Sequence, residues 1–180
     1  AVTSSHFCSS ERQFRFPLNY GGQRTPTAQW TVTGSGAIVV EKQEEPGIKI
    51  KHATIGKIVD LGIKDANNMG AAMAPSAAKT MVSFFKDTKT HPSEYDMIFT
   101  GDLGEVGSNL LKELMLKEGF RLGDNYNDCG LMIYHKEAQD VHAGGSGCGC
   151  SASVLCSLIL KNLKSKKWNN ILFMATGALM

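Results

Sequence analysis

Residues that could bind an anion are concentrated between His142 and Ser153, in the segment HAGGSGCGCSAS. Its glycines allow positive φ values or a close backbone approach, and Ser151 or Ser153 could cap the helix that the apolar residues after it predict. Such a helix start presents N–H groups and a positive dipole end, which suit a carboxylate, a phosphate or a developing oxyanion. The same composition is typical of a tight loop-to-helix packing joint without a ligand, so the segment alone leaves both interpretations open.

The cysteines and acidic residues do not suggest a metal site. An odd number of cysteines without an extracellular spacing indicates reduced thiols, and Cys148 and Cys150 are too close for the usual zinc spacing. Asp124 and Asp128 lie in a polar turn over residues 123–130, but further oxygen ligands of a calcium loop are missing there. We therefore predict no metal, no cofactor and a solvated turn.

The overall composition predicts one globular α/β domain. The chain has 180 residues, 42% of them hydrophobic and 20% charged, with a net charge of +2. This balance gives no support for nucleic acid or an acidic membrane surface as the main partner. Residues 141–160 carry no charge, but their glycine-rich first half favours a buried helix over a membrane span, and no transmembrane segment is expected.

Hydrophobic periodicity predicts the elements that position these residues. Residues 30–41 and 48–60 are β-rich and separated by a Pro-Gly turn, which predicts an antiparallel hairpin. Helices are expected over 71–87 and 105–118 and after the glycine-rich segment, and strands over 95–100 and 171–175. Ligands collect at the carboxyl ends of strands in such sheets, which draws attention to Gly101 and Asp102.

A long segment at residues 6–29 carries arginines among aromatic residues and ends in glycines and a proline. Loops of this length usually cover a site or another chain. Arg12, Arg15 and Arg24 could supply positive charge to a ligand, or could bind another subunit.

The order of these elements resembles the thiolase fold, and five longer segments resemble the stage V sporulation protein AD family of spore-forming bacteria. The segments that carry this closer resemblance are SSHFCSSERQFRFPL from Ser4, QWTVTGSGA from Gln29, DLGIKDANNMGAAMAP from Asp60, TGDLG from Thr100 and GGSGCGCS from Gly144. The resemblance implies an α/β, thiolase-like fold with a mixed five-stranded sheet covered by helices. Residues 1–180 would form the C-terminal thiolase-like domain, the second half of a duplicated fold whose first half lies upstream.

The same resemblance implies a binding protein and not an enzyme. Condensing enzymes of the thiolase superfamily carry a histidine where this chain has Gly101-Asp102, and an asparagine near the position of Cys148. An ionised Asp102 cannot donate a hydrogen bond to a thioester oxyanion. No catalytic residues are therefore expected, and each of the scattered histidines is better explained as a surface or core residue.

The implied ligand is dipicolinic acid (pyridine-2,6-dicarboxylate) or its calcium chelate, taken into the developing spore and released at germination. The implied partners are other stage V sporulation A proteins, with a homodimer as a further option, and the implied place is the forespore or spore, peripheral to the inner membrane. The candidate ligand-binding residues are Ser5, His6, Gly101, Asp102, Gly147, Cys148 and Ser151. Two alternatives remain: an acyltransferase of the thiolase or β-ketoacyl synthase type with its nucleophile upstream, and a structural scaffold for membrane partners.

Overall fold

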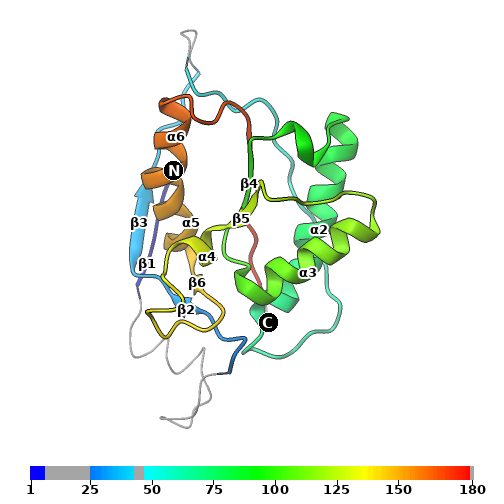
Figure 1. Ribbon diagram of the computed structural model, residues 1–180, viewed down its shortest axis with the longest axis vertical. Helices are drawn as coiled ribbons and strands as arrows, with labels where there is room; N and C mark the ends of the chain where they lie inside the picture. Colours follow the sequence, from blue (N-terminus) through cyan, green and yellow to red (C-terminus); the bar gives the residue numbers. More distant parts are fainter. Residues whose placement is uncertain (7–24, 43–46, 179–180) are drawn as a thin grey trace.

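The computed structural model describes residues 1–6, 25–42 and 47–178, and shows an α/β arrangement in layers (Figure 1). The strands are β1 (Val2–Ser5), β2 (Trp30–Thr31), β3 (Gly34–Ala37), β4 (Met97–Thr100), β5 (Tyr126–Asp128), β6 (Gly145–Ser146) and β7 (Ile171–Met174). The helices are α2 (Met69–Thr88), the 3-10 helix η1 (Pro92–Glu94), α3 (Gly104–Lys117), α4 (Cys129–Met132), α5 (Cys148–Val154), the π-helical turn η2 (Leu155–Ile159) and α6 (Leu160–Lys164). The predicted α/β class is confirmed.

The largest sheet in the described residues is parallel, with the strand order β5-β4-β7. The central strand β4 is buried on both faces, as its apolar sequence requires, because Ile98 and Phe99 point to opposite sides and are both fully buried. The register pairs Thr100 with Asp128 of β5 and with Met174 of β7. The carboxyl ends of the three strands therefore lie side by side.

The other strands form two separate pairs, β1-β3 and β2-β6, in place of the expected single five-stranded sheet. Strand β3 is antiparallel to β1, with Ser5 opposite Gly34, and the ladder continues where the backbone N–H of Ile38 donates to the carbonyl of Ala1 at 2.8 Å. Strand β2 is parallel to β6. This second pair brings the segment after residue 25 against the glycine-rich loop.

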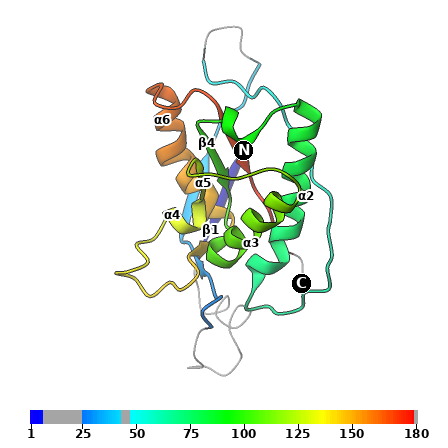
Figure 2. The same ribbon diagram turned by 45° about the vertical axis from the view of Figure 1, so that its right-hand side comes forward.

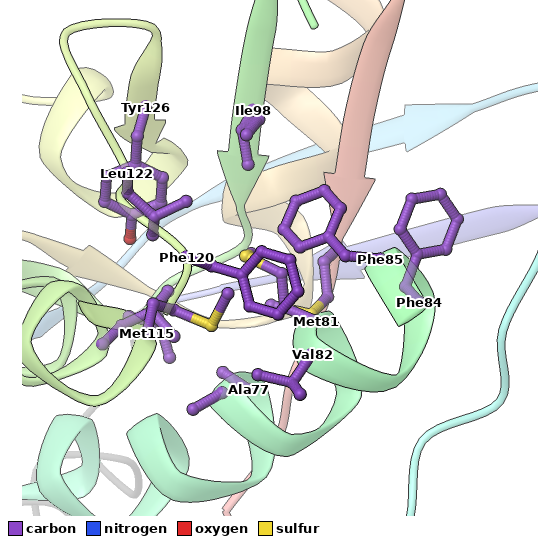
Figure 3. Packing of buried hydrophobic residues seen from close by; sticks show 14 of the residues in the cluster. Ala77, Met81, Val82, Phe84, Phe85, Ile98, Met115, Phe120, Leu122 and Tyr126 are labelled. Atoms are coloured by element: carbon purple, nitrogen blue, oxygen red, sulfur yellow. The ribbon is translucent and has the colours of Figure 1, made fainter. Parts of the chain in front are cut away.

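Helices α2 and α3 cover one face of the parallel sheet and lie next to each other in both views (Figures 1 and 2). Their backbones approach closely at Gly70 and Gly107, where a Cβ on Gly107 would lie only 2.9 Å from the Gly70 Cα. Phe85 and Phe120 form the centre of this core, with ring centroids 5.2 Å apart (Figure 3). The predicted helices and the strand before α3 are confirmed here, with bounds shifted by a few residues.

The helical run α5–η2–α6 covers the opposite face of the same sheet and also packs against β1 and β3 (Figure 1). Cys150, Val154 and Ile159 are buried against Phe99 of β4, and the Trp168 ring lies 5.3 Å from the Phe99 ring. The glycine-rich segment is thus held between two sheets at the start of this run.

Two sequence-based predictions of local structure are wrong. Residues 48–60 form no strand, because β3 pairs with β1 instead; Ile55 and Ile58 are each 96% exposed. In addition, neither Ser151 nor Ser153 caps α5, whose N-cap is Gly147 at φ 105°.

Candidate functional site

Two aspartates meet where the parallel strands end. Asp102 follows β4 in the short turn that leads into α3, and Asp128 is the last residue of β5. The pairing of Thr100 with Asp128 places the two carboxyl-bearing segments next to each other. Strand ends are the usual ligand region of an open α/β sheet, so this edge is the first place to look for a site.

The carboxylate of Asp128 is fully buried and accepts four hydrogen bonds. Its Oδ2 accepts from the Thr100 hydroxyl at 2.6 Å and from the Leu103 N–H at 3.0 Å. Its Oδ1 accepts from the N–H groups of Gly104 and Gly130, both at 3.0 Å. Burial raises the pKa of Asp128 to about 6 although these bonds act in the opposite direction.

This environment also affects the neighbouring ionisable groups. Burial, followed by the charges of Asp128 and Asp102, raises the pKa of the Cys129 thiol to about 12. Burial and the Asp102 charge likewise raise the pKa of the Cys150 thiol. Both thiols therefore stay protonated at neutral pH, which makes them poor nucleophiles.

Asp102 joins the strand end to the glycine-rich loop. It is half-buried, and its Oδ2 accepts a hydrogen bond from the Gly147 N–H at 2.8 Å. A second hydrogen bond connects the same two segments, because the Glu105 N–H at the start of α3 donates to the Ala143 carbonyl at 2.9 Å. The loop and the strand end are thus one connected unit.

Gln29, directly before β2, connects the turn after β4 to the glycine-rich loop. Its Nε2 donates to the carbonyl of Asp102 at 2.7 Å and to the carbonyl of Gly145 at 3.0 Å, and the side chain is buried. Its Oε1 has no partner in the described structure, beside a small cavity of about 10 Å³ lined in part by Thr27 and Asn67. That space is about the size of one water molecule.

Replacing Gln29 by methionine should destabilise the chain by about 2 kcal/mol, because two buried carbonyls lose their donor. Urea unfolding of the wild type and the variant measures this difference. Glu113→Met is the control, since Glu113 is exposed on α3, and this substitution should change stability by no more than about 0.5 kcal/mol. An equal, small effect of both substitutions would show that the Gln29 bridge contributes little.

Ser5 packs directly under the glycine-rich loop. Its hydroxyl donates to the Val32 carbonyl at 2.6 Å and accepts from the Gly149 N–H at 2.9 Å. The thiol of Cys148 is exposed and donates to the Ser4 carbonyl at 2.8 Å. These contacts place the end of β1 against the start of α5.

The structure brings most of the predicted site residues together. Ser5, Gly147 and Cys148 are close neighbours, and Asp102 contacts Gly147. A Cβ on Gly101 would lie 3.7 Å from the Ser151 Cβ, so these two positions are also adjacent. The remaining predicted site residue, His6, is exposed and directly follows Ser5 at the end of β1.

Sequence reasoning missed Gln29 and misplaced Asp128. The sequence predicts a solvated turn over 123–130, but of its two aspartates Asp124 is exposed whereas Asp128 is fully buried. The signal that could have identified Asp128 is its place directly before a Cys-Gly pair at the end of an alternating strand. The arginines Arg12, Arg15 and Arg24 lie outside the described residues.

Two loop amides of this site are already hydrogen-bonded within the protein. The N–H of Gly147 is used by Asp102, and that of Gly149 by Ser5. Among the described residues, no group of three or more His, Cys, Asp or Glu side chains could hold a metal ion. In the same part of the chain, no helix has the length and apolar character needed to cross a membrane. The site can therefore offer hydroxyls, a thiol and a carboxylate, and it can offer the loop amides only if their present partners move.

The fold and this site define an α/β protein in which a glycine-rich loop closes over the carboxyl ends of parallel strands. The model of the family described as Stage V sporulation protein AD matches residues 1–180. Stage V sporulation protein AD of Bacillus subtilis (strain 168) is 51% identical over 181 residues, which cover 100% of this chain and 53% of that protein. The chain belongs to the stage V sporulation protein AD family, a family of sporulation proteins, and spans about half the length of this relative.

Proposed function

We propose that the protein is a non-catalytic, thiolase-like binding protein for dipicolinic acid, free or as its calcium chelate. In this proposal it takes part in the uptake of the compound into the developing spore and in its release at germination. It acts there with other stage V sporulation A proteins, peripheral to the inner membrane. Membership of the sporulation family supports the setting, and the strand-end site supports the binding role.

The observation that carries the proposal is the hydrogen bond between Asp102 and the Gly147 N–H, at 2.8 Å. It shows that the loop amide faces a carboxylate, which is the chemical group that dipicolinate carries twice. Ser5 and Cys148 lie beside this amide and add a hydroxyl and an exposed thiol. A flat dicarboxylate suits a small set of converging polar groups of this kind.

The same contact makes a prediction about calcium. A free dianion would be repelled by the Asp102 carboxylate and would have to displace it from Gly147. A calcium chelate brings a hard cation, which prefers carboxylate oxygens as ligands. We therefore expect calcium to strengthen binding, and binding of the free acid alone to be the weaker case.

A non-catalytic role fits the groups that the site offers. Two of its cysteines, Cys129 and Cys150, are buried thiols with raised pKa values, and Asp102 stands at the strand-end position discussed above. Acyl transfer needs an activated nucleophile and an oxyanion donor. The acyltransferase alternative would gain support if the full-length protein took up an acyl label from a thioester.

Equilibrium binding of dipicolinate to the full-length protein, with and without calcium, tests the proposal. With calcium present, Asp102→Ala and Cys148→Ala should each weaken binding by about 10-fold, because each removes a polar group from the site. Without calcium, Asp102→Ala should not weaken binding, because it also removes the repulsion of the dianion. Cys156→Ala is the matched control, since this half-buried thiol lies near the Ala37 carbonyl, on another turn of the helical run. No binding by the wild type would refute the proposal and favour the scaffold alternative.

A further inference from the structure

We propose that Asp128 is the positioning residue of this site: it fixes the turn after β4 so that Asp102 meets Gly147. The ligand readout of this proposal rests on the proposed function of the same site. Asp128 itself cannot touch a ligand from outside, because its side chain is fully buried. It acts through the backbone that it holds.

Three of the four hydrogen bonds to Asp128 come from one short segment. Thr100 donates from the end of β4, and the N–H groups of Leu103 and Gly104 donate from the start of α3. Asp102 lies between these anchored residues. Its backbone is therefore fixed on both sides by a single carboxylate.

A local capping role does not explain this arrangement. Asp128 is the N-cap of α4 and accepts from Gly130, but this accounts for one bond of the four. The other three cross to a segment 24 to 28 residues away in sequence. Such a set of bonds specifies the relative position of two strand ends.

The charges around Asp128 show why the arrangement needs fixing. Burial raises the pKa of Asp128 most, and the charge of Asp102 raises it further. The remaining ionisable neighbours are Tyr126, Cys129 and Cys150, whose pKa values the Asp128 charge raises in turn. The Asp102 charge therefore opposes the ionised form of Asp128, and the hydrogen bonds from Thr100, Leu103 and Gly104 offset this repulsion.

An asparagine at position 128 has nearly the same shape but the wrong hydrogen-bonding groups. Its oxygen can still accept from Gly104 and Gly130. Its NH₂ group would then face the Leu103 N–H, and donor would meet donor. Asp128→Asn therefore releases the turn on the Asp102 side with little change in volume.

A double-mutant cycle on the full-length protein tests this coupling. The dissociation constant of dipicolinate with calcium is measured at pH 7.5 for the wild type, Asp128→Asn, Asp102→Ala and the double variant. We expect Asp128→Asn to weaken binding by about 10-fold in the wild type and by less than about 2-fold when Asp102 is already alanine. Losses that simply multiply would show that Asp128 does not act through Asp102, and would overturn the inference.

Hydrogen exchange gives a second readout that needs no ligand. The Gly147 amide should exchange faster in Asp128→Asn, whereas the amides of α2 should be unchanged. Asp124→Asn is the matched control, because Asp124 is exposed in the turn before β5, and it should change neither exchange nor binding. Unchanged exchange at Gly147 would overturn the inference.

These readouts separate the two proposals. If the wild type binds no dipicolinate, the proposed function fails, and exchange at Gly147 alone decides the role of Asp128. If Asp128→Asn does not fold, Thr100→Val replaces it: this variant removes the 2.6 Å hydroxyl bond to Asp128 and the 2.8 Å bond to the Tyr126 hydroxyl, and it keeps the carboxylate. It should give the same non-additivity with Asp102→Ala, starting from a loss of about 3-fold, and additive losses would again contradict the inference.

Discussion

Replacing Gly149 by alanine is expected to destabilise the protein by about 3 kcal/mol or to prevent folding, because a Cβ at this position has no room. It would lie 2.3 Å from the Gly34 carbonyl oxygen and 2.7 Å from the Ser5 backbone nitrogen. Both are backbone atoms of residues that pair with each other across β1 and β3. They cannot move apart from α5 without breaking this pairing or the Ser5 hydrogen bond to Gly149.

Thermal and urea unfolding of the variant measure this effect. Gly177→Ala is the matched control, since a Cβ at Gly177 meets nothing within 4 Å and this substitution should be nearly neutral. A Gly149→Ala variant as stable as the Gly177→Ala control would mean that the strand pair adjusts easily to a larger residue.

The contribution of Asp128 to the free energy of unfolding should fall as the pH rises from about 4 to about 6. Its pKa is raised from 3.8 to about 6 in the folded state. Between these values the unfolded chain has released the proton and the folded protein still binds it, so higher pH favours unfolding. The shift corresponds to about 3 kcal/mol, lost between pH 4 and 6 and constant above.

Other carboxylates act in the opposite direction, so the test compares two proteins. The pKa of Asp96 is lowered, for example, by the N–H groups of Asn169 and Asn170, and this contribution grows with rising pH. The free energy of unfolding is measured in urea from pH 4 to 7.5 for the wild type and Asp128→Asn. The wild type should lose stability relative to the variant over this range, and parallel curves would show that Asp128 does not titrate there.

The sequence predicts the elements whose apolar residues repeat with a clear period. Helix α2, helix α3 and strand β4 are recognised because each buries a continuous apolar stripe or run. The strand pairing could not be predicted, since β1 and β3 are short and rich in Ser and Gly. The choice of β1 as the partner of β3, rather than residues 48–60, depends on packing against α5 and not on local pattern.

The site shows the same division. Glycine placement and the strand-end rule bring attention to Asp102 and Gly147, which are in contact. The contributions of Gln29 and Asp128 come from burial, and burial of a polar side chain cannot be recognised from its type alone. Asp128 stands among polar residues in the sequence, yet its carboxylate is enclosed by donors from β4 and α3.

The π-helical turn over Leu155–Ile159 accounts for an irregular spacing in the last helical run. The buried residues Cys150, Val154 and Ile159 are separated by four and then five positions, and Leu163 follows after four more. In a regular α-helix a step of five would turn Ile159 well away from the sheet. The wider turn absorbs one additional residue, so that both ends of the run keep the same side toward β4. The helix can thus be one residue longer than its apolar repeat, and the glycine-rich loop at its start keeps its orientation.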